Sequence, residues 1–246
     1  MQGLLCDLCG VTYPIVDGIP DFIVRDREAG SSSDLRRFQA IDLLAPLYET
    51  RLWYPLVLNL YGGFGTTSLG RLRRMVEDTL NLERGRILDV ACGPGTLSRR
   101  LASPMRAVYG VDLSMGMLRQ GLIYVRRGRT PNVHFARAVV EALPLHDDQF
   151  DAAICGGALH LFADPTAALR EIGRTTKAGS PLAVTTFIAG DKGLLRFPHV
   201  VEHIREDHRF HVFEVSELPR CLSDAGFDRF EPQACGSLLT FSAVKR

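Results

Sequence analysis

A glycine-rich segment, ILDVACGPGT at residues 87–96, is the feature that most constrains the fold of this chain. Its apolar start is typical of a buried parallel strand, and the sequence GPG then predicts a tight turn into a helix. A second apolar run at residues 107–111 ends in Asp112. In a strand–helix–strand unit this acid meets the turn at one edge of the sheet, where it can accept hydrogen bonds from both hydroxyls of a ribose. The two features together predict an α/β fold with an adenosyl-binding site.

The spacing around the turn argues against a dinucleotide. A dinucleotide-binding turn has the pattern G-x-G-x-x-G, whereas Leu97 and Ser98 follow Gly95 here. Asp89, which precedes the turn, would repel a pyrophosphate but suits a ligand with a cationic end. The ammonium and sulfonium groups of S-adenosylmethionine fit this charge pattern, so we expect S-adenosylmethionine to be the cofactor.

With these motifs the chain resembles the class I S-adenosylmethionine-dependent methyltransferases, in particular the ubiquinone/menaquinone C-methyltransferase type, also called methyltransferase type 11. The resemblance covers roughly residues 40–246 and includes the long segment at 141–187, which begins EALPLHDDQFDAAICGGALH. Within this type the sequence is especially similar to plant plastid relatives. Ala91 stands where the family usually has glycine. The resemblance implies methyl transfer to a small acceptor of aromatic, quinonoid or isoprenoid character, at carbon or at oxygen.

The alternation of apolar runs and helical patterns favours a parallel sheet. The resemblance implies a Rossmann-like, seven-stranded, mostly parallel sheet with helices on both faces and an antiparallel end. Strands are expected at residues 87–91, 107–111, 133–138, 150–155, 182–188, 230–232 and 238–244, and helices at 68–82, 97–102, 114–127 and 165–177. Ser68 and Asp164 are the predicted caps of two of these helices.

Three segments of different character are predicted along the chain. Residues 1–24 resemble the second half of a zinc ribbon, in which Cys6 and Cys9 are spaced as metal ligands. Since a structural zinc site needs four ligands, we expect no metal in one isolated chain, while a homodimer that shares two such pairs stays open. Residues 25–34 are polar and serine-rich, which predicts a linker. The methyltransferase domain is expected over residues 35–246, and its first part is predicted to be a helical lid with several aromatic side chains.

The resemblance also implies which residues bind the cofactor. Asp89 and the turn match the motif against which the methionine part is expected to lie, and Asp112 matches the acid that binds the ribose. Leu113 and Met117 are placed to sandwich the adenine, although Met117 could equally belong to the core. Val139 stands where the family has an acid, so backbone groups are expected to bind the adenine there. The predicted cofactor-binding residues are Asp89, Ala91, Cys92, Gly93, Gly95, Asp112, Leu113, Met117, Val139, Val140 and Cys155.

The residues after the strand at 150–155 bear on the acceptor. Gly156, Gly157 and Ala158 are small and leave room for a planar acceptor, and the chain has no Asn/Asp-Pro-Pro-aromatic motif of amino-group methyltransferases there. His160 is the candidate catalytic residue, because a neutral imidazole can take a proton from a phenol or enol near pH 7. The alternative is a histidine that packs against the lid or bonds to backbone.

Composition and charge restrict the remaining function classes. A chain of 246 residues with 46% hydrophobic content can form one large core. A net charge of +1 and a pI near 7.7 give no global basic field, which argues against nucleic acid as a partner. The chain shows no run of about 18 apolar residues and no signal-peptide pattern, so we expect no transmembrane segment and a cytoplasmic location.

Two alternatives to small-molecule methylation stay open. An rRNA-base methyltransferase is suggested by the half ribbon and by a group of arginines at residues 119, 126, 127 and 129. A noncatalytic nucleotide-binding module is suggested by Ala91 and Val139, which depart from the family pattern.

Overall fold

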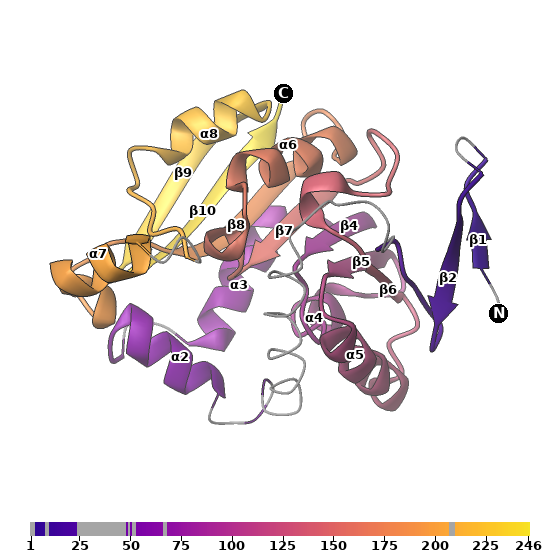
Figure 1. The fold of residues 1–246 in the computed structure, drawn as a ribbon, viewed down its shortest axis with the longest axis horizontal. Coiled ribbons are helices and arrows are strands. Elements are labelled where there is room, and N and C mark those ends of the chain that lie inside the picture. The colour runs from indigo at the N-terminus through magenta and orange to yellow at the C-terminus, as the bar shows by residue number, and fades with distance from the viewer. Residues whose placement is uncertain are drawn as a thin grey trace.

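A seven-stranded sheet forms the centre of the protein in a computed structural model, which describes residues 3–7, 10–23, 48, 50, 53–65, 68–206 and 210–246, with only the backbone of 205–206 (Figure 1). The strand order is β6-β5-β4-β7-β8-β10-β9. The five strands from β6 to β8 in this order are parallel, and β10 pairs antiparallel with both β8 and β9. The predicted fold class is therefore confirmed. The strands are β4 (Gly85–Val90), β5 (Arg106–Asp112), β6 (Val133–Arg137), β7 (Ala152–Gly156), β8 (Pro181–Phe187), β9 (Phe227–Cys235) and β10 (Leu238–Lys245).

Helices cover both faces of this sheet, and strand β4 shows why. Its successive side chains point to opposite faces, as the two-residue repeat of a strand requires. Leu88 and Val90 join a core cluster with α6 and α8, whereas Ile87 joins a second cluster with α3 and α4. The helices are α2 (Trp53–Gly62), α3 (Leu69–Leu80), α4 (Ser98–Leu101), α5 (Met115–Gly128), α6 (Pro165–Thr175), α7 (Pro198–Glu206) and α8 (Leu218–Asp224), with short 3-10 helices η1 (Val140–Ala142), η2 (Leu159–Leu161) and η3 (Leu194–Arg196).

Side-chain caps determine where several helices begin. The Ser68 hydroxyl accepts a hydrogen bond from the Arg71 amide at the start of α3, and Asp164 accepts one from the Ala167 amide at the start of α6. Each cap satisfies one of the amides that the first turn leaves without an intrahelical partner. Both predicted caps are confirmed.

Strand β9 differs most from expectation, whereas β10 lies where a strand was predicted. Only residues 230–232 were expected in a strand, but β9 runs over Phe227–Cys235. It lies at the edge of the sheet and most of its side chains are exposed, so it lacks the apolar pattern by which a strand is predicted. Pro232 fits because an edge strand can leave one side of its backbone without ladder hydrogen bonds.

The N-terminal residues form a small antiparallel sheet of β1 (Gly3–Leu5), β2 (Thr12–Val16) and β3 (Ile19–Pro20). This sheet, which we call the ribbon, packs against β6 and α5. Ile19 is 1% exposed and joins a cluster with Leu118 and Phe135. The Phe22 amide donates to the Arg137 carbonyl at 2.8 Å. The ribbon therefore adds its own contacts to the edge of the main sheet.

Several predictions for the N-terminal part fall outside the described residues. Cys9, the linker at 25–34 and most of the first lid segment lie there. Cys6 is half-buried, and the described residues contain no group of three or more His, Cys, Asp and Glu that could hold a metal ion. A zinc shared between two chains stays a prediction.

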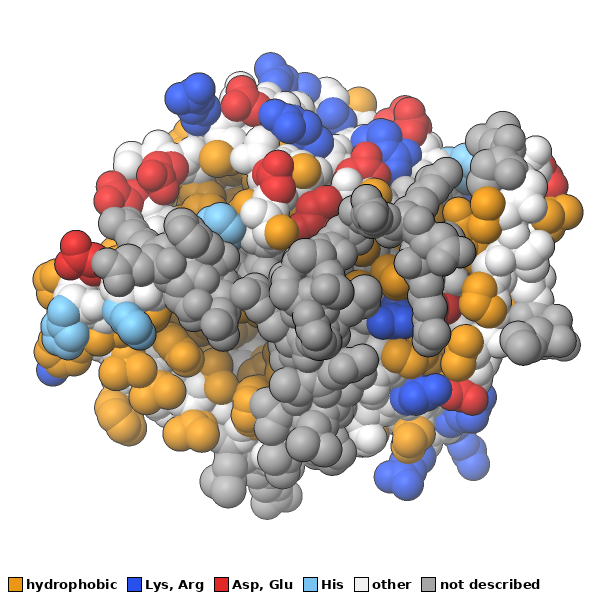
Figure 2. All heavy atoms as spheres, viewed as in Figure 1, with side chains coloured by type: hydrophobic (Ala, Val, Ile, Leu, Met, Phe, Trp, Pro, Cys, Tyr) orange, Lys and Arg blue, Asp and Glu red, His pale blue; other side chains and the backbone are white. Residues whose placement is uncertain are grey.

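The surface is not uniform in character. On the face shown in Figure 2, acidic and basic side chains are interspersed over the upper part, whereas hydrophobic side chains gather at the lower left, where Figure 1 places α2 and α7. Among the described residues, none of the helices is both long and apolar enough to cross a membrane.

We expect Ile19→Ala to lower the free energy of unfolding by about 2–5 kcal/mol, because it leaves a cavity between the ribbon and the main domain. Leu5→Ala is the matched control: Leu5 is in the same ribbon but 65% exposed, so its removal should change stability by less than about 0.5 kcal/mol. Urea denaturation measures both. Equal, small effects would contradict the packing of the ribbon on the domain.

Candidate functional site

The glycine turn lies at the carboxyl ends of the two central strands. β4 and β5 pair up to Val90 and Val111, and the Cys92 amide then donates to the Val111 carbonyl at 3.1 Å. Ala91, Gly93 and Gly95 have φ values of +51°, +55° and +71°. Left-handed backbone suits glycine, so Ala91 is held in a conformation that disfavours its side chain. The contact of this backbone with a ligand stays a prediction.

Close packing below the turn explains a glycine in the turn and a glycine on α5. A methyl group on Gly95 would lie 2.6 Å from Cζ of Phe135, and one on Gly121 of α5 would lie 2.8 Å from the carbonyl oxygen of Pro94. Both distances are too short for a carbon atom. The turn can therefore lie directly on β6 and α5 only with hydrogen at these two positions.

Asp112 joins the turn to the next helix. Its Oδ2 accepts a hydrogen bond from the Gly93 amide at 2.7 Å, and its Oδ1 accepts one from the Ser114 amide at 2.8 Å. A carboxylate has about four lone-pair sites, so both oxygens retain capacity for the hydroxyls of a ribose. Asp112 is 9% exposed. It is thus placed where the sequence predicted a ribose-binding acid.

Asp89 is an almost fully buried acid on β4. It is 2% exposed, and the Ser98 hydroxyl donates to its Oδ2 at 2.5 Å. Burial raises the pKa of Asp89 to about 7, the negative charge of Asp112 adds to the rise, and the hydrogen bond from Ser98 offsets part of it. Two acids therefore lie close enough to interact around the turn, and a cation bound there would stabilise the charged form of both.

Aromatic side chains of the lid lie against the turn. A methyl group on Gly93 would be 3.8 Å from Cε1 of Tyr48, and Tyr48 contacts the rings of Trp53 and Tyr54 at centroid distances of 5.2 and 5.8 Å. The Tyr54 hydroxyl donates to Oγ1 of Thr96 at 3.2 Å. Burial, and then the charge of Asp112, raise the pKa of Tyr48 to about 12. These rings lie against the turn, and the Tyr48 hydroxyl stays neutral at physiological pH.

His160 lies on η2 in an aromatic setting. It is 3% exposed, its Nδ1 is 3.2 Å from Oγ1 of Thr186, and its ring centroid is 4.3 Å from that of Phe210 and 5.0 Å from that of Phe187. Burial and the neighbouring His211 lower the pKa of His160 to about 3. The imidazole is therefore neutral at physiological pH and binds a proton weakly.

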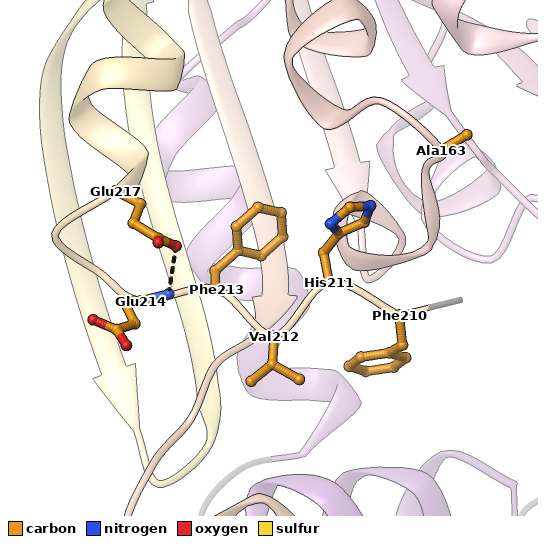
Figure 3. Close-up of a pocket in the computed structure, with 7 residues that line it drawn as sticks. All are labelled: Ala163, Phe210, His211, Val212, Phe213, Glu214 and Glu217. Carbon is orange, nitrogen blue, oxygen red and sulfur yellow. Dashed lines mark hydrogen bonds between the residues drawn. The ribbon is translucent and has the colours of Figure 1, made fainter. Parts of the chain in front are cut away.

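A hollow of about 510 Å³ is lined in part by Phe210 and His211, two residues that contact His160 (Figure 3). The His211 amide donates to the carbonyl of His160 at 2.7 Å, so the wall of the hollow is tied to η2. No motif in the sequence marks this hollow, because its walls come from loops. Its lining residues are Ala163, Phe210, His211, Val212, Phe213, Glu214 and Glu217.

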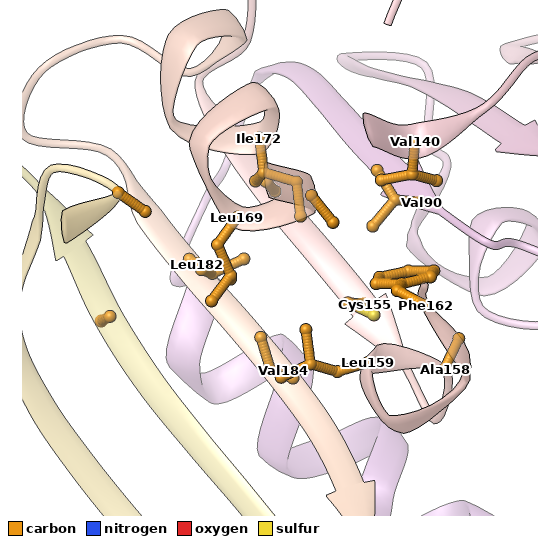
Figure 4. Packing of buried hydrophobic residues seen from close by; sticks show 14 of the residues in the cluster. Val90, Val140, Cys155, Ala158, Leu159, Phe162, Leu169, Ile172, Leu182 and Val184 are labelled. Carbon is orange, nitrogen blue, oxygen red and sulfur yellow. The ribbon is translucent and has the colours of Figure 1, made fainter. Parts of the chain in front are cut away.

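Two other predicted residues have their side chains in the core. Val140 and Cys155 pack with Val90, Leu159 and Phe162 between β7 and α6 (Figure 4). Burial raises the pKa of the Cys155 thiol to about 12 and that of the Cys92 thiol well above its ordinary value. Backbone groups are what Val140 and Cys155 can offer a ligand.

The remaining predicted residues surround Asp112 in the sequence or follow β6. Met117 is 2% exposed, and its amide donates to the Ser114 hydroxyl. The Leu113 carbonyl accepts from Nε of Arg137 at 2.8 Å, and Val139 leads into η1 with extended backbone. Their binding roles stay predictions.

A second hollow, of about 410 Å³, adjoins the turn through Thr96. Helices α2, α3 and α4 form its walls, and it combines apolar side chains with the guanidinium groups of Arg99 and Arg100. Both arginines follow the turn within a few residues. This position is the sequence signal by which they could have been predicted as residues of the site. Its lining residues are Thr50, Tyr54, Pro55, Leu58, Asn59, Ser68, Leu69, Thr96, Arg99 and Arg100.

Known proteins share this sequence and architecture. A family profile described as "Methyltransferase domain" matches residues 87–179, which include the turn, Asp112 and His160. The demethylmenaquinone methyltransferase of Renibacterium salmoninarum is 38% identical over 118 residues, which are 48% of each chain. An uncharacterized chloroplastic methyltransferase of Arabidopsis thaliana is 30% identical over 202 residues, 76% of this chain and 54% of that protein. The chain thus spans about half the length of the curated relatives it matches.

Solved structures share the fold at lower sequence identity. An S-adenosylmethionine-dependent methyltransferase of Thermotoga maritima superposes with a TM-score of 0.61 at 21% identity, over 85% of this chain and all of that one. The matched profile covers most of β4, all of β5, β6 and β7, the turn and Asp112. This chain therefore contains a methyltransferase domain, and it shares its fold with S-adenosylmethionine-dependent methyltransferases.

Proposed function

We propose that this chain transfers the methyl group of S-adenosylmethionine to a small acceptor of quinonoid or isoprenoid character, at carbon or oxygen. The observation that carries the proposal is the pair of buried acids, Asp89 and Asp112, around a turn that presents backbone to its ligand. The relative from Renibacterium salmoninarum is named for methylation of demethylmenaquinone, which supports a quinonoid acceptor.

The residues present fit the cofactor. When bound, S-adenosylmethionine supplies a methyl group already activated on a sulfonium, so alignment matters more than acid–base catalysis. Asp112 would accept hydrogen bonds from the ribose, and Asp89 would stabilise the positive charge of the ligand. Tyr48 and Tyr54 lie over the turn, where aromatic rings exclude water and attract a cation by their negative faces.

The acceptor is proposed to approach from the side of η2. His160 is neutral there, which is the state that accepts a hydrogen bond from a hydroxyl group. Because its pKa is low, we propose that His160 mainly orients the acceptor hydroxyl and takes its proton only as the methyl group is transferred. Phe210 beside it lines the larger hollow and offers apolar surface to a ring.

We propose the cytoplasm as the place of action. Cys92, Cys155 and Cys221 are free thiols. Free thiols suit a reducing compartment.

Asp112→Asn should raise the Kd for S-adenosylmethionine about 10- to 100-fold, because hydrogen bonds to a charged group contribute about 1.5–3 kcal/mol. Isothermal titration calorimetry measures the change, and Asp78→Asn, an exposed acid on α3, is the control with unchanged Kd. Circular dichroism checks that the fold is kept. Unchanged affinity of Asp112→Asn for S-adenosylmethionine, or preferential binding of NAD by the natural chain, would contradict the proposal.

The pKa of Asp89 predicts two opposite pH trends. A folded-state pKa of about 7, against an ordinary 3.8, means that its contribution to stability is complete below about pH 4 and is lost as pH rises through 7. The free energy of unfolding should therefore fall over this range. Affinity for the cationic cofactor should rise over the same range, because binding favours the charged acid and releases a proton.

Asp89→Asn should remove both trends, whereas Asp151→Asn should leave them in place, since Asp151 pairs with Lys177 away from the turn. Calorimetry between pH 5.5 and 8, repeated in buffers of different ionisation enthalpy, counts the protons released. An affinity that stays constant with pH in the natural chain would contradict this role of Asp89.

His160→Gln should lower kcat by about 10- to 100-fold and leave the Kd for S-adenosylmethionine unchanged, since the loss concerns acceptor orientation and proton removal. Methyl transfer from labelled S-adenosylmethionine to a short-chain demethylmenaquinone measures kcat. The profile of kcat against pH should show no inflection near 6.5, because His160 titrates near 3. An unchanged kcat in His160→Gln would show that this histidine is only a packing residue.

A further inference from the structure

Helix α2 has an outward apolar stripe that the proposed function does not use. Leu56, Leu60 and Phe64 follow one another at four-residue spacing and are 60%, 42% and 91% exposed. Leu56 and Leu60, four residues apart, lie on one side of α2, and Phe64 stands in the turn that follows the helix. The described residues 53–65 contain no charged side chain at all. An uncharged helix with an exposed apolar side is unusual for a surface that faces only water.

The structure holds Phe64 in its exposed position. Gly63 and Gly65 on either side of it have φ values of +93° and +70°, and the Gly65 amide donates to Oδ1 of Asn59 at 3.2 Å. Nδ2 of Asn59 in turn donates to the Pro55 carbonyl at 2.6 Å. An ordered turn therefore presents the phenyl ring.

A second segment extends this apolar surface. η3 packs against α2, and Phe197, which follows η3, is 37% exposed. Four of the nine exposed large apolar side chains of the described residues thus lie on these two adjoining elements. Figure 2 shows hydrophobic side chains gathered at the lower left, in the region where Figure 1 places α2. We call Leu56, Leu60, Phe64 and Phe197 the apolar face.

Cations flank the apolar face. A methyl group on Gly63 would lie 2.6 Å from Cβ of Lys192, which places the start of the lysine side chain beside the turn of Phe64. The Arg196 guanidinium lies 4.4 Å from the centroid of the Phe197 ring. Lys192 and Arg196 are both exposed, and Asp191 is the single acid between residues 188 and 200. Apolar side chains with cations at their border match the acyl boundary and the phosphate groups of an anionic lipid surface.

We propose that the apolar face seats the protein on the surface of an anionic lipid bilayer. Leu56, Leu60 and Phe64 enter the boundary between headgroups and acyl chains, while Lys192 and Arg196 bind lipid phosphates. The opposite side of α2 lines the hollow next to the glycine turn with Tyr54, Leu58 and Asn59. An acceptor dissolved in lipid would then reach the protein at α2, the helix that also lines the hollow next to the turn. This consequence rests on the proposed methyl transfer, whereas the lipid contact itself does not.

Vesicle sedimentation tests the proposal directly. The natural chain should pellet with vesicles of phosphatidylglycerol and phosphatidylcholine in equal parts, and bind pure phosphatidylcholine more weakly. The triple variant Leu56→Ser, Leu60→Ser, Phe64→Ser should bind at least about tenfold more weakly, since it removes most of the buried apolar area. The matched control Met105→Ser, Ile123→Ser removes side chains that are 57% and 41% exposed elsewhere, and should bind as the natural chain does.

Two further measurements sharpen the result. Trp53, the single tryptophan, stands at the start of α2, so its fluorescence should be quenched by brominated lipids in the natural chain and not in the triple variant. Lys192→Gln and Arg196→Gln should each weaken binding to the anionic vesicles about fivefold, from about 1 kcal/mol per cation near such a surface.

Several outcomes would overturn the proposal. These are no binding to anionic vesicles, equal binding by the triple variant, or a dimer in sedimentation velocity that the triple variant alone turns into monomers, which would assign the face to a second copy. Calorimetry with S-adenosylmethionine on the same variants keeps the two proposals apart. Vesicle binding without cofactor binding would refute the proposed function and leave the lipid surface in place.

Discussion

The carboxylate of Asp112 is the group on which the rest of the site depends. It accepts hydrogen bonds from the Gly93 and Ser114 amides, and so joins the turn after β4 to the first turn of α5. A buried amide left without a partner costs about 1–3 kcal/mol of stability. Loss of this carboxylate would therefore destabilise the conformation of the turn. The group proposed to bind the ribose is thus also the group that builds the binding turn. Asp112 therefore combines a structural role with its proposed role in ligand binding.

Phe135 supports the same turn from below. Its ring fills the space that a side chain on Gly95, Gly110 or Gly121 would need. The ring also shares a cluster with Ile19, so the ribbon and the cofactor turn contact opposite parts of one apolar group. Protein interiors contain few voids, so a shift of one buried side chain moves its neighbours. The ribbon is therefore connected to the site by packing, although it lies beyond the edge of the sheet.

Patterns that depend on local chemistry could be predicted from the sequence, while those that depend on distant contacts could not. The turn, Asp112 and the caps at Ser68 and Asp164 follow from spacing and residue type within a few positions. β9 was mostly missed because an exposed edge strand has no apolar repeat. The surroundings of His160 involve Thr186 and Phe210, far along the chain, so its burial and low pKa could not be derived from GGALH alone.

The contact of the ribbon with β6 also decides how the sheet ends. An outermost strand carries a row of backbone groups that can pair with another chain, and proteins must cover or disrupt such rows. On one side, the Phe22 amide and the isolated bridge between Asp21 and Arg137 shield β6. On the other side, β9 carries Pro232 and a bulge opposite residues 242–244 of β10. The edge at β6 is thus covered by the ribbon, and the edge at β9 is interrupted by its proline and bulge. A chain without its first two dozen residues would keep protection against self-association only at β9.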